Sequence, residues 1–148
     1  MFEITTLAVN PEFANEGKWV EYPGTPAKFK IARFNNRKAE LARHEANLEL
    51  YKRLQAQLKS NTPEEFTDTE ALQVQAKVMS QHILKDWEGI SKNGESLAYS
   101  PEAAYELLAD PAYYDFYMFV FNEAISHENY SAETEEAVVE DVKTSADS

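Results

Sequence analysis

The sequence contains no cysteine, only four glycines in 148 residues, and no apolar run near the roughly 18 residues that a membrane span requires. Without cysteine it has no disulfide, no thiolate metal ligand and no thiol nucleophile, which suits a reducing compartment. The glycines form none of the GxxxxGKS/T, GxGxxG or GxSxG patterns, so we expect no cofactor. Residues 1–6 lack a basic segment followed by an apolar one, so we expect the protein to stay where it is made.

Basic residues are also scarce. The 14 Lys and Arg against 26 Asp and Glu give a net charge of −12, which repels a phosphate backbone and argues against a nucleic-acid ligand. The histidines, His44, His82 and His127, are far apart, and His82 with Asp86 predicts only a polar pair on a helix surface. Catalysis needs titratable groups gathered in a pocket, and no local spacing gathers them here. We therefore expect the protein not to be an enzyme.

The apolar residues suffice for one folded domain. Hydrophobic residues make up 43% of the chain, including eight Phe, eight Tyr and two Trp. We predict an N-terminal arm or edge strand at 1–17, a single domain at 18–130 and an acidic tail at 131–148. The tail has two interpretations: disorder that aids solubility, or a segment that docks on a basic partner.

Residues 18–34 predict a β-hairpin. Residues 18–22 and 27–34 are rich in aromatic and β-branched residues, and a Pro-Gly-Thr-Pro turn separates them. Alternation puts Phe29 and Ile31 on one face and Lys28 and Lys30 on the other. We expect the lysine face to be wet.

A long amphipathic helix is predicted at 36–59, with Asn35 as its N-cap. Its polar side carries Glu and Lys or Arg residues, including Glu49 and Arg53 four apart. We expect this helix to lie on another element. Its apolar residues share about half of the helical wheel: Leu41, Leu48, Tyr51, Leu54 and Leu58.

Three further helices are predicted, at about 70–87, 101–109 and 111–128. Apolar residues that recur at i, i+4, i+7 and i+11 indicate the first helix, and Gly89 is its expected stop. Ser-Pro and Asp-Pro pairs are the caps that open the other two helices. Asn93 and Gly94, between the first and second of these helices, are a tight-turn signal and predict a short hairpin or an ordered loop. The fold class is therefore mainly α (α+β): a helical bundle with a small N-terminal β-hairpin and a disordered acidic C-terminal tail.

Two aromatic residues have alternative interpretations. Phe119 projects beside Asp115 and Asn122, so it marks either a contact surface or a second covering element. Trp87 stands at a predicted helix end between two acids, as either a lid on the core or an anchor for a partner.

The sequence resembles the tail assembly chaperones of long-tailed bacteriophages. The similarity extends over roughly residues 17–130, and its separate blocks occur in the expected order. The blocks are 17–22 (GKWVEY), 29–36 (FKIARFNN), 86–89 (DWEG), 93–94 (NG), 99–102 (YSPE) and 107–110 (LLAD).

The resemblance implies a protein that binds the tape measure protein, keeps its long hydrophobic helix soluble and helps to recruit tail tube subunits. It also implies self-association along the partner, a location in the host bacterial cytoplasm and absence from the finished virion. Exposed apolar side chains would supply affinity, and the net charge would keep the complex dispersed. The candidate partner-binding residues are Trp87, Phe119, Leu48, Tyr51, Leu54 and Leu58.

Two other functions remain open. A structural adaptor or connector of the virion would stay in purified particles. An acidic DNA mimic would need carboxylates at phosphate-like intervals over one face, whereas residues 18–59 interleave acids with Lys and Arg.

Overall fold

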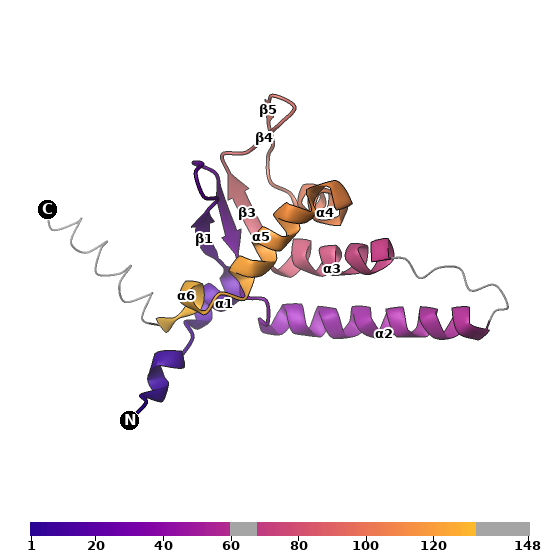
Figure 1. The fold of residues 1–148 in the computed structure, drawn as a ribbon, viewed down its shortest axis with the longest axis horizontal. Coiled ribbons are helices and arrows are strands. Elements are labelled where there is room, and N and C mark those ends of the chain that lie inside the picture. Colours follow the sequence, from indigo (N-terminus) through magenta and orange to yellow (C-terminus); the bar gives the residue numbers. More distant parts are fainter. Residues whose placement is uncertain (60–67, 133–148) are drawn as a thin grey trace, which may run out of the picture.

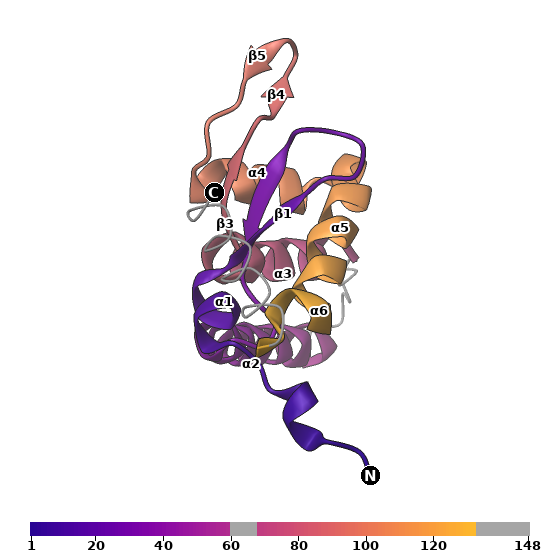
Figure 2. The same cartoon turned by 90° about the vertical axis from the view of Figure 1, so that its left-hand side faces the viewer.

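A computed structural model describes residues 1–59 and 68–132. Helices flank a three-stranded antiparallel sheet, and a two-stranded hairpin projects beyond it (Figures 1 and 2). The α+β class and the N-terminal hairpin are confirmed. Most of the predicted acidic tail, residues 133–148, lies outside the described residues. The helices are η1 (Ile4–Leu7), α1 (Pro11–Glu16), α2 (Arg37–Lys59), α3 (Asp68–His82), α4 (Pro101–Ala109), η2 (Pro111–Tyr113), α5 (Tyr114–Ala124) and α6 (His127–Tyr130).

The larger sheet has the strand order β1 (Lys18–Glu21), β2 (Lys28–Ile31), β3 (Leu84–Glu88). In β2, Phe29 and Ile31 are buried and the two lysines point outward, as the alternation predicts. Phe29 pairs with Val20 of β1 and with Trp87 of β3.

The third strand corrects the predicted helix at 70–87. The helical stripe holds only to His82, after which Leu84 and Trp87 enter the sheet beside β2. Pairing with a strand more than 50 residues earlier in the chain outweighs the local helical pattern, because it satisfies the backbone of β2 on its second side. Gly89 therefore ends a strand, at φ +79°.

The sequence left residues 1–17 open as an arm or an edge strand, and the structure places the short helix α1 within them. Asn10 caps α1 by accepting hydrogen bonds from the backbone N–H of Glu12 and Phe13, and Pro11 occupies the first helical position. Val9 forms a β-bridge with Ser131, so the segment before α1 is joined to the segment after α6.

The predicted final helix at 111–128 is divided. Asp110 caps the short η2, α5 ends at Ala124, and α6 follows after Ser126. The phenolic O–H of Tyr130 in α6 donates to the backbone oxygen of Ile31 at 2.9 Å, and this ring is fully buried. The Asn-Gly turn forms the predicted hairpin, from β4 (Ser91–Lys92) to β5 (Glu95–Ser96).

Asn36, and not Asn35, caps α2. Its side-chain oxygen accepts from the backbone N–H of Ala39 at 3.0 Å, and its amide donates to the backbone oxygens of Arg33 and His82. The sequence offers two adjacent asparagines, and only the tertiary contact with the end of α3 distinguishes them. Asn36 is buried, whereas Asn35 is exposed.

Replacing Asn36 with alanine is expected to lower the free energy of unfolding by about 1–2 kcal/mol, since a helix cap and a link between α2 and α3 are lost together. Asn35→Ala is the matched control and should change it by less than about 0.5 kcal/mol. Urea unfolding followed by circular dichroism measures both. Equal losses in the two variants would contradict this capping assignment.

Candidate partner-binding surface

The helix α2 has two different faces. The face toward α3 carries small residues, among them Ala39, Ala42 and Ala46, and Ala39 is fully buried. Small side chains allow two helices to approach closely. The guanidinium of Arg43 lies over the ring of Phe34 at 3.8 Å and donates to the Phe34 backbone oxygen at 2.6 Å, which fixes the start of α2 to the body.

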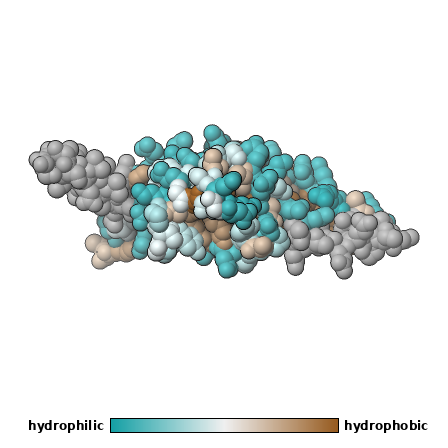
Figure 3. All heavy atoms as spheres, turned by 90° about the horizontal axis from the view of Figure 1, so that it is seen from above, coloured by the Kyte–Doolittle hydropathy of each residue, from teal (hydrophilic) through white to brown (hydrophobic). Residues whose placement is uncertain are grey.

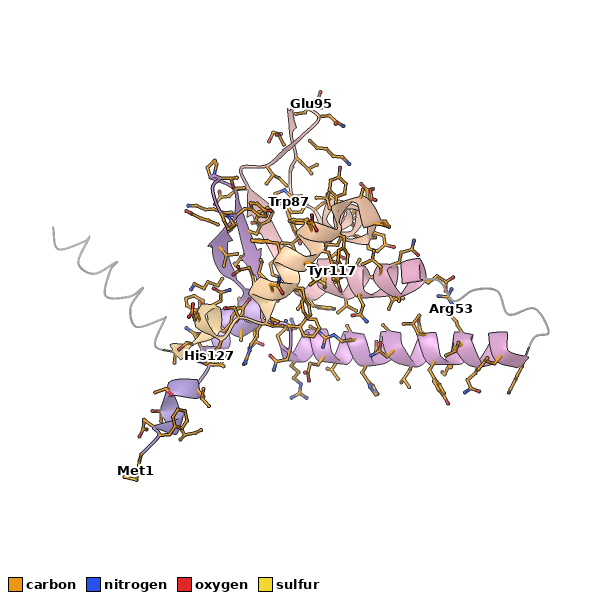
Figure 4. All side chains as sticks on the ribbon, viewed as in Figure 1. Met1, Arg53, Trp87, Glu95, Tyr117 and His127 are labelled. Atoms are coloured by element: carbon orange, nitrogen blue, oxygen red, sulfur yellow. The ribbon has the colours of Figure 1, made fainter. Side chains whose placement is uncertain are left out.

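Between α2 and α3 lies a cleft of about 490 Å³. Its lining is mixed, with Leu50, Val74 and Val78 beside charged and amide side chains. At this cleft Arg53 of α2, which is labelled in Figure 4, contacts Glu70 of α3 at 3.4 Å. A lining of this kind favours the packing of two helices over the binding of a small apolar ligand.

The opposite face of α2 exposes a row of large apolar side chains, which we call the outer stripe. In Figure 1, α2 runs horizontally, with α3 above it. Tyr51 accepts a hydrogen bond from Gln55 across one turn of this face. The outer stripe consists of Leu41 (57% exposed), Leu48 (47%), Tyr51 (60%), Leu54 (38%) and Leu58 (70%).

Exposure of this row is unusual for a soluble domain. Single exposed leucines are ordinary, whereas several on one helix face form a contiguous apolar area. The face seen in Figure 3, viewed from above and away from α2, is dominated by hydrophilic residues with small apolar areas near its middle. Four of the six predicted site residues, Leu48, Tyr51, Leu54 and Leu58, therefore lie together on one accessible surface.

Trp87 does not belong to that surface, which corrects its assignment as a partner anchor. Its ring is 4% exposed, packs edge-on against Tyr99 at 5.0 Å and donates from Nε1 to the Leu97 backbone oxygen at 2.8 Å. Figure 4 shows it inside the body near the sheet. Trp87 is the lid on the core.

Phe119 also lies away from the outer stripe. Its ring centroid is 5.7 Å from that of Phe29 and 4.8 Å from that of Tyr22, so the β1–β2 hairpin is the second covering element for α5. The pattern on α5 is mixed because this helix buries one side against the core, at Val120, and another against the hairpin. Phe119 is half-buried and supports the fold.

The structure has a second exposed apolar area, which the sequence pattern does not predict. Phe2, Ile4 and Leu7, at the N-terminal segment, are 70%, 67% and 53% exposed. In Figures 1 and 2 this segment projects from the body at the end labelled N. The short 3-10 turn η1 places them without a regular period, so hydrophobic spacing gives no signal for this area.

Charge is distributed unevenly over the fold. The helix α2 contains six Lys or Arg and three Glu, a net charge of +3, although the whole chain carries −12. Residues 101–130, which hold α4, α5 and α6, contain six acids and no Lys or Arg. The outer stripe therefore lies on the most basic helix of an acidic protein.

More positive charge lies near the start of α2. Partial burial lowers the pKa of Lys85, Glu16 raises it, and Lys38 and Lys30 lower it further. Partial burial also lowers the pKa of His82, and Lys85 and Lys38 act in the same direction. Lys38 belongs to α2, so the charges of Lys30, Lys38 and Lys85 lie near one another at the start of that helix, whereas the lowered pKa of His82 favours its neutral form.

Over the ranges 1–59 and 68–132, no three His, Asp or Glu side chains come together as a metal site. None of the helices in these ranges is long and apolar enough to cross a bilayer.

A family profile described as "YdaY prophage protein" matches residues 34–141, well over half of the chain. The chain belongs to the YdaY prophage protein family. This YdaY family protein is thus of phage origin, and the matched range includes α2, α3 and the acidic helices but not the β1–β2 hairpin. No curated protein and no solved structure matches the chain.

Proposed function

We propose that this YdaY family protein is a tail assembly chaperone that binds an amphipathic helix of a tape measure protein through the outer stripe. The observation that carries the proposal is the row of four leucines and a tyrosine, 38–70% exposed, on one face of α2. A helix laid along such a row is held by apolar anchors spaced three, four and seven residues apart.

The energetics agree with this role. Full burial of a leucine is worth about 1.5–3 kcal/mol, so covering the remaining exposed area of several leucines supports a reversible complex. The charge of +3 on α2 favours a partner helix with acidic residues beside its apolar stripe. The six acids of residues 101–130 give every copy like charge, and this repulsion would disperse a complex of many copies.

The proposal extends to assembly. Several copies bind along one long tape measure helix, and tail tube subunits replace them as the tail forms. The protein then acts in the host cytoplasm without chemistry or cofactor and is left out of the finished particle.

Co-expression tests this function. The partner is the longest helix-rich protein encoded beside this gene, produced alone and together with the chain. We expect the partner to move from the insoluble to the soluble fraction and to co-purify with the chain. An unchanged insoluble fraction would argue against the chaperone, and recovery of the chain from purified virions by mass spectrometry would favour a structural adaptor.

A further inference from the structure

Six residues on the open face of α2 follow a heptad pattern. Their spacings alternate between three and four residues, as in the seam of a coiled coil. They cover an arc of roughly 100° that points away from α3, and all six are exposed. These residues, the outer seam, are Leu41, His44, Leu48, Tyr51, Gln55 and Leu58.

We infer that a second copy of this chain pairs with the outer seam, with the two α2 helices antiparallel. In the register that uses the whole seam, Leu41 of one copy meets Leu58 of the other, and Leu48 meets Tyr51. Each of these layers occurs twice by symmetry, with His44 against Gln55 between them. The apolar layers at the centre and ends supply the affinity.

Charges beside the seam select this orientation. In the antiparallel register Glu45 lies beside Lys52 of the other copy, twice, and a parallel pair would instead place Glu40 beside Glu45, twice. Shifting the antiparallel register by one heptad would oppose Glu45 to Glu45 or Lys52 to Lys52. Each such exposed ion pair contributes little binding free energy alone, but together the pairs favour this register over the parallel and shifted ones.

The seam carries the same unfavourable pair at each of its two ends. Lys38 faces Lys59 of the other copy, where both side chains are exposed and solvent screens the repulsion. A single pair of helices buries less area than a stable complex needs, so we expect a dissociation constant on the order of 10 µM. Such a dimer covers the outer stripe until a tighter partner displaces it.

Cysteine crosslinking tests the arrangement, because the native chain has no thiol. Leu41→Cys and Leu58→Cys proteins are treated with a short bifunctional thiol reagent, separately and mixed. The mixture should give crosslinked dimer, whereas Leu41→Cys alone should not, since the two copies of position 41 lie about 25 Å apart in this register. Ala56→Cys, exposed but off the seam, reports random collisions. Efficient crosslinking of Leu41→Cys alone would overturn the antiparallel register.

Charge reversal supplies an independent measurement by sedimentation equilibrium. Glu45→Lys and Lys52→Glu should each weaken the dimer by about tenfold, and the double variant should restore it. A wild-type chain that stays monomeric at all concentrations, or a double variant that fails to restore association, would overturn the inference. Both tests use the chain alone, so their failure leaves the proposed function standing, and failure of the co-expression test leaves the dimer standing.

Discussion

Replacing Trp87 with alanine is expected to lower the free energy of unfolding by about 3–5 kcal/mol. The substitution removes a ring that is 4% exposed and packed edge-on against Tyr99. It also removes the hydrogen bond from Nε1 to Leu97, which ties the strand β3 to the segment after the β4–β5 hairpin. A cavity and an unpaired carbonyl oxygen therefore arise together.

Guanidinium unfolding measures this loss, and two variants calibrate it. Trp87→Phe keeps most of the packing but loses the hydrogen bond, so we expect about 1–2 kcal/mol. Trp19→Ala removes a tryptophan that is 40% exposed on β1, and we expect less than about 1 kcal/mol. A Trp87→Ala protein as stable as Trp19→Ala would show that the ring is not part of the core.

The features that the sequence predicts correctly have local causes. Alternation along β2 places Phe29 and Ile31 inward because the side-chain period of a strand is two. Ser100 caps α4 through its hydroxyl because serine before proline suits the start of a helix. The same signal, Asn10 before Pro11, was available for α1 and would have predicted that helix.

The features that the sequence could not predict depend on contacts distant in the chain. Residues 84–87 belong to the helix that the local pattern predicts, and they become part of a strand because β2 offers an open edge. Phe119 looks exposed on a wheel of α5 until the hairpin, about 90 residues earlier, covers it.

The outer stripe likewise depends partly on a local pattern and partly on contacts distant in the chain. The helical wheel identifies the apolar row on α2 but does not say which face meets the body. Ala39, Ala42 and Ala46 face α3, so the leucines that a wheel would bury are left outside. Ala39 is fully buried, whereas Ala42 and Ala46 line the cleft between α2 and α3, where Arg53 and Glu70 are in contact at 3.4 Å.

Replacing Leu48 and Leu58 with glutamate is expected to abolish solubilisation of the co-expressed partner while changing the stability of the chain by less than about 1 kcal/mol. Both side chains are already largely in water, at 47% and 70% exposure, so folding loses little. A complex that needs them buried would have to desolvate two carboxylates, a cost of several kcal/mol each. The readout is the fraction of partner in the soluble lysate, with unfolding curves measured in parallel.

Ile125→Glu is the matched control, because Ile125 is 52% exposed just after α5, outside the outer stripe. It adds one of the same charges at a similarly accessible apolar position, so general effects of charge on solubility appear in both proteins. An equal fall of partner capture with Ile125→Glu would show that added charge alone, and not loss of the outer stripe, lowers capture. Capture that survives both changes would remove the outer stripe from the mechanism, since no reversible complex buries two unpaired carboxylates without loss of affinity.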